Sequence, residues 1–134
     1  MTLADLIGIP YEKNGRTLKG ADCFGLCRLA RKYLEGRDDI PAYITPEKFR
    51  EIEKAVKEER DLNWQRIEPG RERSGDWVLL KKRGFAMHCG YVTEPGWMLH
   101  TEEGIDSVHV RYGTLEHPWE KIEGFYRYGR INSH

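Results

Sequence analysis

The sequence predicts an α+β fold, in which N-terminal helices pack on a C-terminal antiparallel β-sheet. Apolar residues recur at helical spacing in residues 23–35 and 49–56, whereas from about residue 64 the chain consists of short apolar runs broken by glycines. These runs are typical of strands and read DWVLLKK, FAMHCGYV, GWMLHT, SVHVRY and GFYRYGRI. The 134 residues contain no repeat, low-complexity segment or linker, so we expect a single domain spanning residues 1–134.

The segment GADCFGLCRLARKYLE, residues 20–35, combines a turn, a cysteine and an amphipathic helix. Asp22 is a favourable helix N-cap, so the helix is expected to begin at or near Cys23 and to end near Gly36. The unpaired N–H groups and the positive dipole end of a helix N-terminus favour a thiolate. Cys23 is therefore predicted to be acidic enough to react as a nucleophile near neutral pH.

A second helix is predicted to begin with Thr45 as its N-cap and Pro46 as its first residue. Phe49, Ile52 and Val56 give this helix a narrow apolar stripe. Its other faces carry the charge run EKAVKEER, which is expected to be a solvated helix face.

Two histidines in predicted strands are candidate partners for Cys23. Alternation over residues 85–92 places His88 on the same face as Ala86. A hairpin turn at TEPG would place His100 on the next strand, facing the same way as His88. A nucleophilic thiol needs a base, and the base needs a group that fixes its ring, so these three side chains form the predicted catalytic set.

The remaining cysteines and histidines are weaker candidates for chemistry. Cys27 lies one helical turn beyond the nucleophile, and Cys89 lies on the strand face opposite the candidate base, so both are interpreted as packing residues. His109, in the alternating run SVHVRY, is the reserve candidate for the third member. His117 and His134 are interpreted as surface residues.

The chain resembles the NlpC-type cysteine peptidases, papain-like enzymes that cut the peptide stems of bacterial cell-wall peptidoglycan. The resemblance extends over residues 4–128 and rests on several motifs in the family's order, which is more specific than one pentapeptide. The motifs are Asp22-Cys23-Phe24-Gly25-Leu26, preceded by Pro10-Tyr11 and Asn14-Gly15, then Gly75-Asp76-Trp77-Val78, His88-Cys89-Gly90 and the third polar residue His100.

The resemblance implies a thiol peptidase that needs no metal and no cofactor. Cys23 would be the nucleophile, His88 the base and His100 the residue that orients the base. Tyr11 and Asp22 would take part in oxyanion stabilisation or substrate binding. The implied substrate is an amide bond in a peptidoglycan stem peptide.

Two residues depart from the family's pattern. Many members have Ser where this chain has Phe24, and Gly where it has Arg16. The Phe variant, the small size and the ending GFYRYGR resemble the phage-tail branch of the family, whose members sit at the tail tip. This branch implies a virion-tail location and other tail-tip proteins as partners. Residues 12–20, EKNGRTLKG, form a polar loop that contains glycine, so Arg16 is expected to be solvated rather than to bind substrate.

The charge balance bears on the remaining partners and on the place of synthesis. Lysine and arginine number 22, as do aspartate and glutamate, so no global positive field is expected to attract nucleic acid or an anionic membrane. Residues 1–15 show no basic leader before an apolar stretch, and no apolar run is long enough to cross a bilayer. We therefore expect synthesis in a bacterial cytoplasm without a signal peptide, with the three cysteines reduced.

Three alternatives stay open at the level of sequence. A structural zinc site is the least favoured, because neighbouring residues 88 and 89 of a strand point to opposite faces. A tail-assembly component that retains the fold but relies little on catalysis is the second. A related thiol-dependent amidase or acyltransferase is the third, since the same catalytic set can move several acyl groups.

Overall fold

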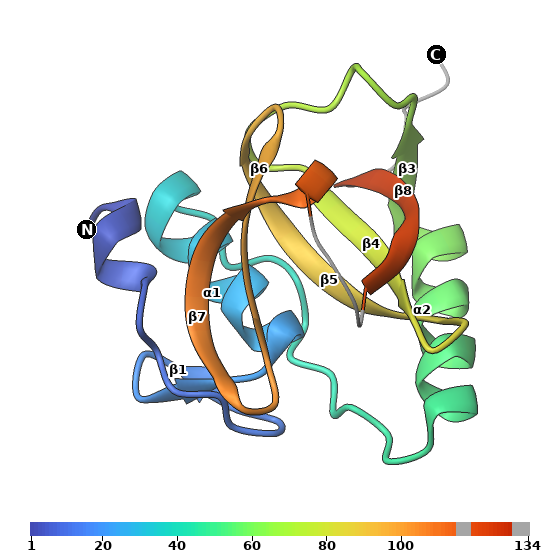
Figure 1. The fold of residues 1–134 in the computed structure, drawn as a ribbon, viewed down its shortest axis with the longest axis horizontal. Helices are drawn as coiled ribbons and strands as arrows, with labels where there is room; N and C mark the ends of the chain where they lie inside the picture. Colours follow the sequence, from blue (N-terminus) through green and yellow to red (C-terminus); the bar gives the residue numbers. More distant parts are fainter. Residues whose placement is uncertain (115–118, 130–134) are drawn as a thin grey trace.

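The helical and alternating patterns fold into two helices beside a six-stranded antiparallel sheet, which confirms the predicted α+β class (Figure 1). This computed structural model describes residues 1–114 and 119–129. Its elements are η1 (Leu3–Leu6), β1 (Arg16–Thr17), β2 (Gly20–Ala21), α1 (Cys23–Glu35), α2 (Phe49–Asn63), β3 (Trp64–Ile67), β4 (Trp77–Lys82), β5 (Phe85–Glu94), β6 (Trp97–Glu102), β7 (Ile105–Arg111), η2 (Tyr112–Thr114) and β8 (Trp119–Tyr128).

Helix α1 begins and ends where the sequence predicts. The side chain of Asp22 accepts a hydrogen bond from the Gly25 N–H, so the helix starts at Cys23. Gly36 ends it with a φ of 71°, a left-handed conformation that glycine adopts without strain. The nucleophile candidate is thus the first residue of a helix whose start is fixed by its neighbour.

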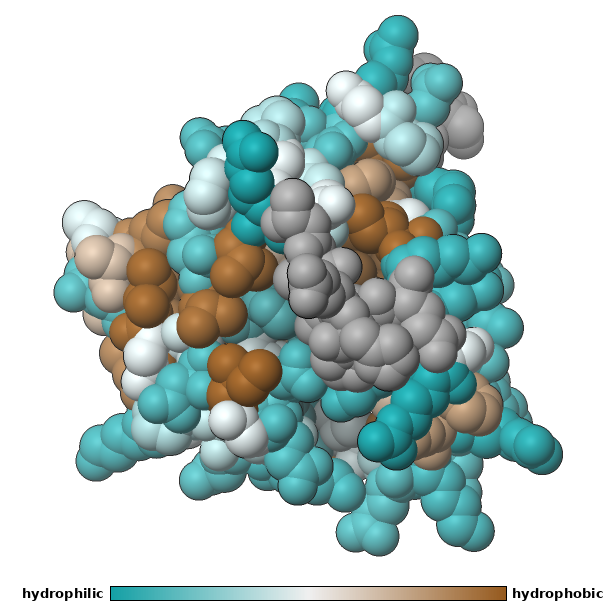
Figure 2. All heavy atoms as spheres, in the orientation of Figure 1, coloured by the Kyte–Doolittle hydropathy of each residue, from teal (hydrophilic) through white to brown (hydrophobic). Residues whose placement is uncertain are grey.

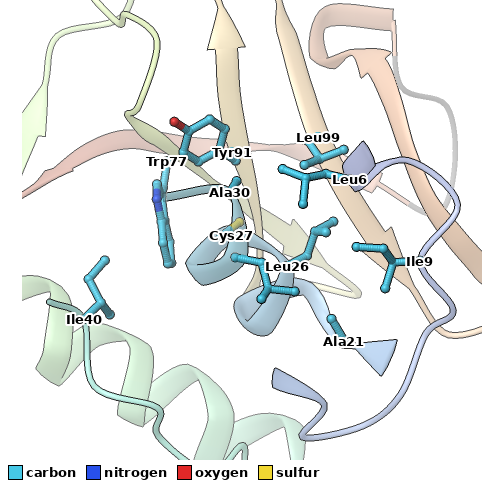
Figure 3. Close-up of a cluster of buried hydrophobic side chains, with 11 residues drawn as sticks. Leu6, Ile9, Ala21, Leu26, Cys27, Ala30, Ile40, Trp77, Tyr91 and Leu99 are labelled. Atoms are coloured by element: carbon cyan, nitrogen blue, oxygen red, sulfur yellow. The ribbon is translucent and has the colours of Figure 1, made fainter. Parts of the chain in front are cut away.

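The inner face of α1 packs into the main hydrophobic core. Leu26, Cys27 and Ala30 are fully buried, in one hydrophobic cluster with Tyr91 of β5 and Leu99 of β6 (Figure 3). Burying side chains of this size stabilises the fold by roughly 1.5–3 kcal/mol for each large aliphatic residue. The helix is therefore held rigidly against the strands that carry the histidines.

The sheet order is β3-β8-β4-β5-β6-β7, so the last strand inserts between β3 and β4. An ion pair crosses this junction: the Arg127 guanidinium donates to both carboxylate oxygens of Asp76, at 2.7 and 2.9 Å. Asp76 is 1% exposed, so the paired arginine compensates for the burial of its charge. The Gly75-Asp76 motif therefore has a structural role, which is to join the C-terminal strand to the sheet.

The predicted alternation of β5 is wrong at its first residues. The ladder between β4 and β5 pairs Leu80 with His88 but Lys81 with Ala86, so Met87 is an extra residue in β5. Such a bulge moves the residues before it to the opposite face. Ala86 consequently packs with the buried side chains of Leu79 and Tyr126 and does not share the face of His88.

Helix α2 begins later than predicted. Its first residue is Phe49 and its N-cap is Lys48, whereas the sequence indicated Thr45 as the cap and Pro46 as the first turn. The Thr45 N–H instead donates to Oδ1 of Asn14 at 2.7 Å, so a contact with a distant loop replaces the local cap. Within α2 no residue is fully buried, although Val56 packs against the sheet.

The outer surface is mostly hydrophilic. Figure 2 shows hydrophilic side chains over most of one face, with separate apolar side chains near β7. Among the described residues, neither helix has the length and apolar character needed to span a bilayer.

Gly25 offers a test of how α1 is seated. A Cβ at this position would collide with the backbone oxygen of Gly15, in the loop that precedes β1. We expect Gly25→Ala to lower the free energy of unfolding by about 1–3 kcal/mol, as overpacking does, in urea denaturation followed by circular dichroism. Gly113→Ala is the matched control, because nothing lies within 4 Å of a Cβ there. Equal stabilities of the two variants would contradict this packing.

Candidate active site

Cys23 lies at the N-terminus of α1, beside His88 of β5. The histidine ring carries a side-chain hydrogen bond with Cys23, and the charge of Cys23 raises the pKa of the imidazole. Cys23 is half-buried and lines a cavity, and its own N–H belongs to the first helical turn, which has no intrahelical acceptor. The structure therefore brings the predicted nucleophile and base together.

His88 and His100 form a buried pair. Nε2 of His88 lies 2.9 Å from Nδ1 of His100, and the two side chains project from the neighbouring strands β5 and β6. The bond occupies one ring nitrogen of His88, which leaves Nδ1 for the thiol. If Nδ1 accepts the thiol proton, Nε2–H donates to His100, so His100 fixes both the ring plane and the tautomer.

Burial keeps both imidazoles neutral. It lowers the pKa of His100 from 6.5 to about 4. Burial also lowers the pKa of His88, assisted by the charges of His100 and Lys82 and opposed by Cys23. A neutral His88 can accept a proton, as a general base must.

The electrostatics of Cys23 differ from the prediction. A hydrogen bond with Cys89 and burial raise the pKa of the Cys23 thiol well above its ordinary value, while His88 lowers it by a smaller amount. Cys23 is therefore a thiol at neutral pH, and its proton must pass to His88 during attack.

Cys89 is the contact that sequence reasoning missed. Its Sγ lies 3.8 Å from Sγ of Cys27, and it also carries a hydrogen bond with Cys23. The three sulfurs thus form one cluster between α1 and β5. The signal was present in the sequence, because Cys23 and Cys27 are spaced by four residues and Cys89 lies on the strand face that α1 covers. Cys27 itself is buried in the core, as predicted.

Tyr11 lies near the nucleophile. It forms an isolated bridge with Ala21, just before the helix, and its side chain is half-buried. Burial, together with the charges of Cys23 and Asp22, raises the pKa of the Tyr11 hydroxyl to about 12. The hydroxyl is therefore protonated at neutral pH and can donate a hydrogen bond.

Asp22 is directed toward the loop that precedes α1. Besides capping the helix, its carboxylate accepts from the Asn14 N–H at 2.9 Å and from the Arg16 guanidinium at 2.6 Å. Asp22 is 4% exposed and does not line the cavity. Its hydrogen bonds position the first turn of α1.

The two residues that depart from the family's pattern contact each other. The Arg16 guanidinium lies over the Phe24 ring, 5.1 Å from its centroid, and donates to the Tyr43 carbonyl at 2.6 Å. Phe24 also packs edge-on against Trp77 at 5.8 Å. The expectation that Arg16 is solvated is wrong, because its side chain is 15% exposed and engaged on both sides.

A cavity of about 550 Å³ opens beside Cys23, between α2 and the sheet. Cys23, His88 and Cys89 belong to the lining of this cavity, whereas His100 and Tyr11 do not. Its volume falls within the range of small-molecule sites. The thiol and its base are therefore open to a ligand in this cavity.

The other histidines lie apart from this pair. Nε2 of His109 lies 2.7 Å from the Thr93 hydroxyl, and the ring packs against Trp97. His109, the reserve candidate for the third member, thus contacts Thr93 and Trp97, whereas His100 is the histidine that bonds to His88. His117 and His134 lie outside the described residues.

The zinc alternative requires cysteines and histidines to converge on one point. His88 and Cys89 are adjacent on β5 and both hydrogen-bond with Cys23, while His88 also contacts His100 and Cys89 also contacts Cys27. Within residues 1–114 and 119–129, no group of three or more His, Cys, Asp or Glu side chains is arranged to hold a metal ion.

The fold is similar to several solved structures. The NlpC/p60 domain of the peptidoglycan hydrolase SagA aligns with a TM-score of 0.61 and 19% identity, over 92% of this chain and 90% of that one. NlpC1 from Trichomonas vaginalis aligns with a TM-score of 0.62 and 17% identity, over 93% and 41% of the two chains. An NlpC/p60 family protein from Bacillus cereus aligns with a TM-score of 0.61 and 18% identity, over 95% and 40%.

This chain spans about two fifths of the T. vaginalis and B. cereus proteins. No protein-family model and no curated protein sequence matches it. The structural likeness, at low sequence identity, shows that the chain has the NlpC/p60 fold.

The thiol cluster predicts how substitutions move the reactivity of Cys23. Cys89→Ala should shift the midpoint of iodoacetamide alkylation at Cys23 to lower pH, because it removes the contact that raises the thiol pKa. His88→Ala should shift the midpoint to higher pH. The measurement is mass spectrometry of the Cys23 peptide after timed alkylation, with His109→Ala as the control that leaves the midpoint in place. An unchanged midpoint in Cys89→Ala would exclude this contact.

Burial of neutral His100 predicts a pH dependence of stability. Since its pKa is 6.5 in the unfolded chain and about 4 when folded, the unfolded chain binds the proton first as the pH falls. His100 therefore favours the folded state fully above pH 6.5, and this contribution is lost toward pH 4, by up to about 3 kcal/mol. Urea unfolding at several pH values should show a flatter profile for His100→Gln than for the wild type. Parallel profiles would argue against a neutral buried ring.

Proposed function

We propose that this chain is a cysteine peptidase that hydrolyses amide bonds in the stem peptides of peptidoglycan. The observation that carries the proposal is the 2.9 Å pair of His88 and His100, with Cys23 beside the first ring. The NlpC/p60 fold supports the substrate class, because SagA, which shares this fold, is named a peptidoglycan hydrolase. The proposed unit is a single domain of residues 1–134.

The first half of the reaction transfers the acyl group to the enzyme. As Sγ of Cys23 attacks the amide carbonyl, its proton passes to Nδ1 of His88, while His88 keeps its Nε2–H bond to His100. The resulting imidazolium donates the proton to the leaving amine. The products are a thioester at Cys23 and a free amine.

The second half returns the enzyme to its starting state. His88 accepts a proton from water, whose oxygen attacks the thioester, and the acid leaves with Cys23 protonated again. The N–H of Cys23 and the Tyr11 hydroxyl would donate to the oxyanion, at roughly 3 kcal/mol per donor. Asp22 acts indirectly in this scheme, because it fixes the turn from which the Cys23 N–H projects.

The tail-associated setting rests on Phe24 at the position after the nucleophile, and it stays a prediction. It would place the protein in a virion tail with tail-tip proteins as partners. A tail component with little catalysis is the rival in that setting. The arrangement of Cys23, His88 and His100 favours catalysis, since an assembly role does not require a buried histidine pair.

The test is mass spectrometry of peptidoglycan fragments after incubation with the purified protein. We expect new stem-peptide products, whose masses identify the bond that is cut. Cys23→Ala should form none, and His88→Ala should lower the rate by about 10²–10⁴-fold through loss of the base. His109→Ala is the matched histidine control and should keep wild-type activity. Folded protein that releases no product from several wall types would count against the peptidase.

A further inference from the structure

The walls of the cavity beside Cys23 are largely apolar. On one side Ile52, Val56 and Leu62 project from α2, and on the other side Trp64 and Trp77 project from the sheet; Phe24, Tyr43, Leu79 and Met87 complete the apolar lining. A cavity of about 550 Å³ with such walls favours an apolar ligand, because binding removes the apolar surface of both the ligand and the walls from water.

Of the three charged residues of the lining, Glu58 is exposed, whereas Glu59 and Arg60 are engaged with neighbouring side chains. The carboxylate of Glu59 accepts from Nδ2 of Asn63 at 2.9 Å and from Nε1 of Trp64 at 3.0 Å. Arg60 pairs with Asp61 at 3.1 Å and with Glu123 at 3.5 Å. Neither side chain is therefore available at low cost to a charged substrate group, since a broken pair leaves a desolvated charge.

Phe24 connects the apolar cavity to the nucleophile. It follows Cys23 in the first turn of α1 and packs against Trp77 and Tyr43 of the cavity wall. Arg16 fixes this arrangement, because it covers the Phe24 ring and holds the Tyr43 carbonyl. The residue pair that departs from the family's pattern thus builds the apolar wall next to the thiol.

We propose that this cavity binds an apolar acyl group, an aliphatic chain attached to the carbonyl that Cys23 attacks. The inference rests on the proposed thiol chemistry of Cys23 and His88, and it adds a second substrate class, aliphatic esters or amides, which is distinct from the stem peptide. With an ester, the Sγ–C bond forms as the alcohol leaves with the thiol proton relayed by His88. Water then cleaves the thioester and releases the carboxylic acid.

The experiment measures hydrolysis of p-nitrophenyl esters from acetate to decanoate. For the wild type, kcat/KM should rise by about fourfold per added methylene until the cavity is filled. Ile52→Gln, which places an amide in the cavity wall, should flatten this dependence. Ile105→Gln is the matched control, because Ile105 is 43% exposed on β7 and outside the cavity, and it should retain the wild-type slope. Cys23→Ala should abolish turnover of every ester.

A second measurement tests the cavity without catalysis. Decanamide should change the tryptophan fluorescence of Cys23→Ala, because Trp64 and Trp77 line the cavity, and acetamide should not. Cys23-dependent turnover that is independent of chain length would overturn the acyl site while leaving the nucleophile intact. An absence of Cys23-dependent turnover would count against the proposed chemistry, and an absence of decanamide binding would overturn the acyl site.

Discussion

The carboxylate of Asp22 is the constraint on which the site depends. It caps α1 through the Gly25 N–H, and it holds the preceding loop through Asn14 and Arg16. Because Arg16 also reaches the Tyr43 carbonyl, one buried charge connects the start of the helix, the loop and the wall of the cavity. Charge-assisted hydrogen bonds of this kind are strong and directional, so the position of the neighbouring thiol follows from them.

The burial of the two imidazoles and of the thiol determines which protonation states the site holds at rest. In water an imidazole and a thiol would each titrate near their ordinary values, but burial disfavours every charged form here. His88 and Cys23 are therefore both neutral at rest, and charge develops only when the substrate carbonyl is attacked. The polarity of the site is concentrated in the His88–His100 bond and the first turn of α1, while the adjoining cavity is apolar.

Local patterns predicted the parts of this molecule that depend on local physics. The N-cap, the start of α1 and the shared face of the two histidines follow from capping, alternation and a short hairpin turn. The start of α2 could not be predicted, because Thr45 bonds to Asn14, a partner 31 residues away in the sequence. The bulge at Met87 has no residue signature, and the burial of Arg16 depends on a ring that only the folded chain brings near.

The wall of the cavity that α2 forms is less deeply buried than the walls that α1 and the sheet form. α1 fills the main core, whereas α2 contributes no fully buried residue and leaves Leu62 55% exposed. An element with few buried apolar contacts opens at a lower free energy than the global unfolding transition. We therefore expect the amide hydrogens of α2 to exchange with solvent before those of α1, and a ligand bound between α2 and the sheet to slow that exchange by adding the contacts that the helix lacks.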